Sequence, residues 1–230
     1  MYKMDASNPI FRVVYRDNKS RRCTDFYHAA NAEEALAFAV NNGLTHIYKN
    51  IVEVPKQFFP NFENISNGNT DEDRARFFAY KKHADQKYGT GPYTIHLDAV
   101  RQVLKDFDWV MTDIIVSGWL HDTIEDTNTT QEEINALFGA QVARIVWACS
   151  GVGKNRKERN ESIYAKLKEC PEGVCVKLAD RIANVESAKA NDPKKFEMYK
   201  KEYEAFESAL LPLDNSITDM WDRLDTVFLG

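Results

Sequence analysis

The stretch Ser117–Thr130, SGWLHDTIEDTNTT, joins an apolar segment to four ionisable side chains within six positions. The residues that lead into it, DIIVSGWL, are mostly apolar and predict a buried helix. If the helix continues, His121 and Glu125 lie one turn apart, as do Asp122 and Asp126, and both pairs share one face. Buried charged groups are costly unless they are compensated, so the pattern indicates a bound cation or partner charges at this point.

His96 and Asp180 are two further candidates for the same site. His96 follows a Gly-Pro turn at the start of a predicted helix, in GPYTIHLDAV, and Asp180 lies within the apolar run VCVKLADRIANV. An Asp in such a helix either ligates a metal or pairs with a cation, for which Arg181 is the neighbouring alternative. Each residue alone is better explained as a cap, a packed side chain or a solvated helix end. Together with the His-Asp and Glu-Asp pairs, they predict a divalent-metal site with carboxylates beside it.

The composition is typical of a soluble globular protein, since the 230 residues are 43% hydrophobic and 28% charged. The formal net charge of −5 argues against nucleic acid as a partner, although a local cluster of Lys and Arg could still bind a small phosphorylated ligand. No segment resembles a signal peptide or a membrane-spanning helix, so we expect a cytoplasmic protein without membrane contact. The cysteines show no CxxC pair or zinc-ribbon spacing and are expected to be reduced thiols: Cys23, Cys149, Cys170 and Cys175.

The fold class is predicted to be mainly α, with a small α+β module in ββαβ order at residues 1–58. In this module the β-rich runs IFRVVYRD and RRCTDFYHA flank a turn, a capped helix follows from Asn31, and HIYKNIVEVP predicts another strand. Residues 59–70 are predicted to be a linker, and residues 71–230 a helical domain. The amphipathic segment that starts at Lys195, KFEMYKKEYEAFESALL, is expected to pack on the protein's own core rather than on a second subunit.

A cluster of four cations lies in the segment SGVGKNRKERN at residues 150–160, which is interpreted as a glycine-containing loop before a helix. Such a cluster on an acidic protein suits a polyphosphate clamp, and a solvated flexible loop is the alternative. The four cations are Lys154, Arg156, Lys157 and Arg159.

The order His96, His121-Asp122, Asp180 matches the H…HD…D signature, and the chain resembles the HD-domain metal-dependent phosphohydrolases. More narrowly, it resembles the hydrolase domain of RelA/SpoT-type alarmone enzymes and their small stand-alone relatives, over about residues 72–190 and most specifically in LHDTIEDT. The resemblance implies a helical bundle in which the signature residues hold one Mn²⁺, at a site that would also accept Fe²⁺, Zn²⁺ or another divalent metal. Glu125 and Asp126 would then flank the attacking water.

For the substrate, the resemblance implies a small phosphorylated nucleotide: pyrophosphate would be removed from the 3′ position of guanosine tetra- or pentaphosphate. The family carries a basic Arg-Lys-Ser-Gly-Glu-Pro loop between a Gln and a Tyr-x-x-His. This chain has QKYGTGPYTIH there, in which the loop is one residue shorter, and RIAN in place of the family's Arg-Leu-His-Asn. These departures bear on base preference rather than on catalysis. The family places the equivalent of the cation cluster beside the site, which favours the clamp. The predicted substrate-binding residues are Lys87, Lys154, Arg156, Lys157, Arg159 and Asn184.

Two other functions stay open at this level. The first is another HD-domain nucleotidase or phosphatase, such as a 5′-nucleotidase or a phosphatase of a dinucleotide cofactor. The second is a non-catalytic, antitoxin-like nucleotide-binding protein that uses the N-terminal module for interaction. The sequence does not decide the oligomeric state.

Overall fold

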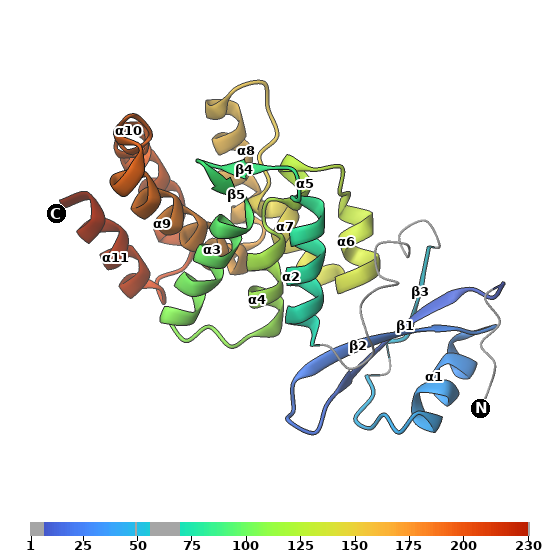
Figure 1. Cartoon of the computed structure of the whole chain (residues 1–230). Coiled ribbons are helices and arrows are strands. Elements are labelled where there is room, and N and C mark those ends of the chain that lie inside the picture. Colours follow the sequence, from blue (N-terminus) through green and yellow to red (C-terminus); the bar gives the residue numbers. More distant parts are fainter. Residues whose placement is uncertain (1–6, 49, 56–69, 230) are drawn as a thin grey trace.

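A computed structural model describes residues 7–48, 50–55 and 70–229. Its N-terminal module is a three-stranded antiparallel sheet in the order β2-β1-β3, with one helix (Figure 1). The predicted ββαβ order is confirmed, although the last strand is shorter than HIYKNIVEVP suggested. The elements are β1 (Ile10–Arg16), β2 (Arg22–His28), α1 (Ala32–Asn41) and β3 (Val52–Val54).

The two faces of β1 contact different cores, as the alternation of side chains along a strand requires. Phe11 and Val13 pack with Phe38 of α1 in the core of the module, whereas Ile10 belongs to a cluster of the helical domain. Arg12 lies on the same face as Ile10 and therefore points toward the helical domain. The module is thus docked against the helices by one face of its sheet.

The remaining elements are helical apart from a two-stranded β4–β5 hairpin, in agreement with the predicted fold class (Figure 1). The long helix α9 contacts α3, α4, α10 and α11 and lies at the centre of the largest core cluster. The bounds are α2 (Asp71–Lys82), β4 (Lys87–Tyr88), β5 (Gly91–Pro92), α3 (Thr94–Asp106), α4 (Thr112–Leu120), α5 (Thr123–Asp126), α6 (Gln131–Phe138), α7 (Ala140–Cys149), α8 (Arg156–Lys168), α9 (Val174–Asn191), α10 (Pro193–Leu210) and α11 (Thr218–Leu229), with short 3₁₀ turns at Pro171–Gly173 and Leu211–Leu213.

The helix expected through SGWLHDTIEDT is interrupted, because α4 ends at Leu120 and α5 begins at Thr123. His121 and Asp122 occupy the junction with right-handed helical dihedral angles, and the Asp126 N–H donates to the Asp122 carbonyl at 2.9 Å. The one-turn spacing of the acidic residues therefore survives the interruption.

Two further predictions about the helices have a clear outcome. The amphipathic segment from Lys195 forms most of α10 and packs on α9 through Phe206 and Leu210, so the expectation of contact with the protein's own core is confirmed. The cluster at residues 150–160 is not a loop up to residue 160, because Asn155 caps α8 and the helix begins at Arg156.

The described residues test the remaining predictions only in part. Residues 59–69 of the predicted linker lie outside the described residues, and Thr70 already caps α2, so the boundaries 1–58, 59–70 and 71–230 stay predictions. The four cysteines are free and buried. Within the described ranges, none of the helices combines the length and apolar character needed to span a bilayer.

Candidate active site

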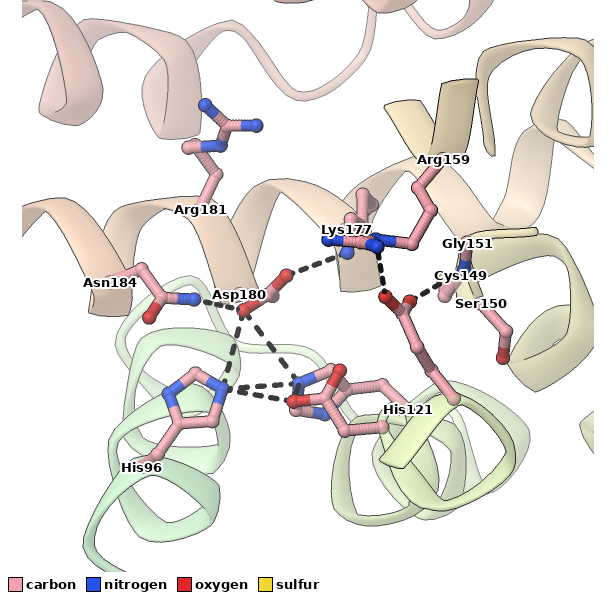
Figure 2. Close-up of polar contacts among 12 residues, drawn as sticks. His96, His121, Cys149, Ser150, Gly151, Arg159, Lys177, Asp180, Arg181 and Asn184 are labelled. Atoms are coloured by element: carbon pink, nitrogen blue, oxygen red, sulfur yellow. Dashed lines mark hydrogen bonds and ion pairs between the residues drawn. The ribbon is translucent and has the colours of Figure 1, made fainter. Parts of the chain in front are cut away.

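Four side chains from three parts of the fold converge at one point. His96 comes from the first turn of α3, His121 and Asp122 from the α4–α5 junction, and Asp180 from the middle of α9 (Figure 2). One potential ligand atom from each lies within 4.8 Å of all the others. The structure therefore brings together the four residues that the sequence nominated as metal ligands.

The ligand atoms of these four side chains lie close to one another. The Nε2 atoms of His96 and His121 are 3.2 Å apart, and Asp180 Oδ1 lies 3.3 Å from the first and 3.7 Å from the second. Asp122 Oδ2 lies 2.9 Å from His121 Nε2 and 3.4 Å from His96 Nε2. Two imidazole nitrogens and two carboxylate oxygens thus face one another in a largely buried space.

The donor chemistry of the group fits a divalent cation. His121 Nδ1 lies 2.8 Å from the Gly118 carbonyl oxygen, which can only accept, so Nδ1 carries a proton and Nε2 is free to ligate. His96 Nδ1 is buried without a partner among the described residues. Mixed imidazole and carboxylate sets of this kind suit first-row divalent metals.

Lys177, which the sequence analysis did not single out, compensates the charge of Asp180. Its Nζ lies 2.8 Å from Asp180 Oδ2, and both side chains are nearly inaccessible. Burial acts to raise the pKa of Asp180, but the Lys177 ammonium and the two histidines lower it well below its ordinary value. The signal was present in VKLAD, since a residue three positions before the Asp shares its helix face.

Arg181, the alternative partner for Asp180, does not pair with it. Figure 2 shows Arg181 on the opposite side of α9, pointing away from the histidines. Its guanidinium instead donates to Glu202 of α10 at 3.2 Å and lies over the Phe206 ring. The cationic neighbour of Asp180 is therefore the residue one turn earlier, not the next one in sequence.

One tyrosine and one amide donate to the carboxylates of the group. The Tyr93 hydroxyl donates to Asp122, and the Asn184 amide donates to Asp180. Tyr88 donates to the Asn184 oxygen at 3.1 Å, and its ring stacks on His96 with the centroids 5.0 Å apart. Asn184, predicted to bind substrate, is thus placed beside the group with its amide nitrogen already engaged.

Glu125 and Asp126 lie next to the group on α5, each held by one neighbour. Glu125 accepts from the Gly151 N–H at 2.5 Å and lies 3.6 Å from Arg159 Nε. Burial raises the pKa of Glu125 above its ordinary value. Asp126 accepts from the Gln86 amide at 2.8 Å, an additional contact that the sequence analysis did not identify.

A small pocket opens beside these residues, with a volume of about 150 Å³. We call it the inner pocket; its lining residues include Asp122, Glu125, Asp126, Arg156, Arg159, Lys177, Asp180, Arg181, Asn184 and Tyr199. Of the predicted clamp, Arg156 and Arg159 line it from one face of α8, and Arg156 also forms a two-point ion pair with Glu202 at 2.5 and 2.9 Å. Lys154 and Lys157 are exposed and do not line the inner pocket, and neither does Lys87, which is exposed in β4.

Comparison with known proteins agrees with this geometry. The profile of the HD domain matches residues 75–206. A guanosine-3′,5′-bis(diphosphate) 3′-pyrophosphohydrolase of Aquifex aeolicus is 40% identical over 120 residues, which are 50% of this chain and 17% of that protein. The protein MESH1 of Danio rerio, with the same enzyme name, is 37% identical over 117 residues, 47% of this chain and 63% of its own. The chain thus spans less than two thirds of either relative.

A solved structure shares the fold. It belongs to a metazoan orthologue of SpoT described as hydrolysing ppGpp, and it matches with a TM-score of 0.60 at 20% identity, over 71% of this chain and 96% of the other. The profile covers more than half of the chain and includes the four converging residues. The chain therefore belongs to the HD-domain family and is related to the ppGpp hydrolase domains of SpoT and MESH1.

Proposed function

We propose that this HD-domain phosphohydrolase removes pyrophosphate from the 3′ position of a (p)ppGpp-type alarmone. The observation that carries the proposal is the convergence of two histidines and two aspartates beside a second acidic pair and a cation-lined pocket. The relatives named as 3′-pyrophosphohydrolases support the substrate class.

The four converging side chains would hold the metal, for which we propose Mn²⁺ because carboxylates and imidazoles together suit that ion. A divalent ion at this point supplies a water of lowered pKa and a Lewis acid for the phosphoryl group. The ligands themselves are kept in place by the hydrogen bonds of Tyr93, Asn184 and Gly118, which fix the carboxylate and imidazole orientations.

Glu125 is our assignment for the group that takes a proton from the attacking water. Its carboxylate is held at the edge of the inner pocket by the Gly151 N–H and lies near Arg159. Burial raises its pKa, which makes the carboxylate a stronger base than an exposed Glu. Asp126, oriented by Gln86, is the second candidate for this role.

The cations of the inner pocket suit the leaving pyrophosphate. Arg156, Arg159 and Lys177 bring positive charge to the lining of this pocket, where charge on the departing group would be stabilised. A volume of about 150 Å³ is enough for phosphate groups but not for a whole nucleotide.

A neighbouring cavity of about 530 Å³ offers room for the nucleoside. We call it the outer pocket; it shares Asn184 with the inner pocket and is lined by Tyr88, Ile95, Ser187, Asp192 and Lys195, among others. Lys195 Nζ lies 5.4 Å from the centre of the Tyr88 ring, so an aromatic surface and a cation occur together there. Substrate would therefore extend from the outer pocket to the four converging side chains His96, His121, Asp122 and Asp180, which we call the metal group because we propose that they hold the metal.

One observation favours a second candidate, a phosphatase of other nucleotides on the same scaffold. Lys87, which stands in for the basic loop of the family, is exposed and lines neither pocket. Guanine would then be recognised without that cation, and a less selective enzyme becomes the alternative.

The test is a substrate panel with the purified 230-residue chain and Mn²⁺. Pyrophosphate released from ppGpp supports the 3′-pyrophosphohydrolase, whereas orthophosphate released from mononucleotides or from a phosphorylated dinucleotide cofactor supports the second candidate. Asp180→Asn serves as the inactive control. A protein that binds stoichiometric metal and turns over no nucleotide would refute both enzymatic proposals and favour a binding protein.

A further inference from the structure

A separate pocket lies between the N-terminal sheet and the helical domain. Figure 1 shows the sheet at the opposite end of α2 and α4 from α5 and the β4–β5 hairpin, which border the metal group. This module pocket has a volume of about 420 Å³. The lining residues used below are Arg12, Arg16, Arg22, Tyr48, Asp71 and Asp113.

Arg12 is a buried cation that forms no ion pair with the described residues. Its side chain comes from the face of β1 that is docked on the helices, and the residue is only 6% exposed. Its Nη1 donates to the Asn135 carbonyl at the end of α6, at 3.1 Å, but its buried Nε has no partner. Within the described ranges no carboxylate forms an ion pair with Arg12. The carbonyl explains where the guanidinium lies, yet it is a dipole rather than a charge, and the buried Nε keeps an unused donor.

The acidic residues of the pocket are already engaged by another arginine. Arg22 Nε lies 2.6 Å from Asp71 Oδ2, and Arg22 Nη1 lies 2.7 Å from Asp113 Oδ1. Asp71 also accepts from the Thr24 hydroxyl at 2.6 Å. Both acids pair with Arg22, and Asp71 also attracts Arg12 without an ion-pair contact. The three arginines and two aspartates of this pocket therefore leave a surplus of one positive charge, and Arg12 and the exposed Arg16 both stand outside the ion pairs.

An aromatic surface lies beside the surplus charge. The ring of Tyr48 is partly exposed in the pocket, with the Arg16 guanidinium 5.9 Å from its centre. Arginine forks bind phosphate oxygens in pairs, and an exposed ring of this kind can stack against a base. The volume falls within the range of sites for small molecules and exceeds what a single phosphate ion would fill.

We propose that the module pocket is a second ligand site, which binds a phosphorylated molecule of mononucleotide size. Arg12 and Arg16 contact the phosphate, and Tyr48 lies against the base or sugar. The site is independent of the hydrolytic reaction proposed above, because none of its lining residues belongs to the metal group or to the inner pocket.

The test measures binding by titration calorimetry with the full chain in EDTA, where no metal is available for hydrolysis. The probes are AMP, GMP, ribose 5-phosphate and inorganic phosphate. Arg12→Met and Arg16→Gln should each weaken nucleotide binding at least about tenfold, since each removes a charge-assisted contact. Arg21→Met, at an exposed arginine just before β2 that does not line the module pocket, is the matched control and should bind like the wild type.

Arg159→Gln separates this site from the inner pocket. Binding that falls with Arg159→Gln but not with Arg12→Met or Arg16→Gln belongs to the metal site and overturns the proposal. The absence of binding by any probe up to about 1 mM also overturns it. Inorganic phosphate that binds as tightly as the nucleotides overturns the assigned size. Circular dichroism tests whether Arg12→Met is folded. If Arg12→Met does not fold, Arg16→Gln decides the outcome.

Discussion

Replacing Lys177 with Met removes the buried ammonium beside Asp180 and keeps an unbranched side chain of similar reach. Without metal, the site holds the carboxylates of Asp122 and Asp180 against the Lys177 ammonium and His121. Although burial acts to lower the pKa of His121, the Asp122 charge raises it to about 10, so His121 is protonated at neutral pH. The variant would therefore leave one buried carboxylate without its cation.

Breaking a buried ion pair from one side costs about 3–5 kcal/mol. We expect the lower end, about 3 kcal/mol, because His96 is a second imidazole in contact with Asp180 and its pKa is also raised. A divalent metal ion brings two positive charges to the two carboxylates, so Mn²⁺ should restore most of the lost stability. The loss should accordingly be large in EDTA and small in the presence of metal.

The assay is urea unfolding followed by circular dichroism, in EDTA and in Mn²⁺. Lys200→Met, at an exposed position of α10, is the matched control and should change the free energy of unfolding by less than about 0.5 kcal/mol. A loss below about 1 kcal/mol for Lys177→Met in EDTA would refute the charge balance argued here. The same loss with and without metal would show that Lys177 acts by packing instead.

Three further outcomes are expected. Asp122→Asn and Asp180→Asn should each lose bound metal, measured by elemental analysis, together with hydrolysis. Glu125→Gln combined with Asp126→Asn should keep stoichiometric metal and lower the turnover rate by about 10²–10⁴-fold; an unchanged rate would exclude both residues from proton transfer. Because burial raises the pKa of Glu125, the rate should fall as the pH decreases through that raised value and the carboxylate gains its proton. Glu125→Gln should remove this acidic limb from the residual activity, and a limb that persists would assign it to another group.

The convergence of the four candidate ligands could be predicted because burying such side chains carries an unusual free-energy cost. An aspartate in an apolar helix and a His-Asp pair after a buried helix demand compensation, and this demand is visible without coordinates. The ββαβ module was predictable for a different reason, since local turn and capping residues such as Asn31 fix short elements.

The partners of these residues were harder to predict because they depend on helix phase. Arg181 follows Asp180 directly, but successive residues in a helix point about 100° apart, and Lys177 lies on the same face. The same periodicity separates the cations that line the inner pocket from those that do not. Because α8 begins at Arg156, Arg156 and Arg159 lie on the helix face toward the inner pocket. Interpreting the segment as a loop hid this division.

Arg12 could not be identified from the sequence, because the meaning of its charge depends on which distant segments surround it. The module pocket is lined by β1, β2, the start of α4 and the α6–α7 junction. The α6–α7 junction follows Arg12 by more than a hundred residues in the sequence. Only the fold shows that the two nearby aspartates form their ion pairs with Arg22 and that Arg12 forms none with the described residues.

The metal group and the module pocket follow from one argument about charge, with opposite signs. In the first, buried carboxylates exceed what Lys177 alone compensates, which calls for a cation. In the second, the arginines outnumber the aspartates by one and a buried guanidinium stands outside the ion pairs, which calls for an anion. Two helices join these places: α4 begins at the pocket and ends at His121, and α7 begins there and ends just before Gly151, which holds Glu125. Since α4 is only nine residues long, about 14 Å separates its ends, so the two charged sites lie at opposite ends of one short helix.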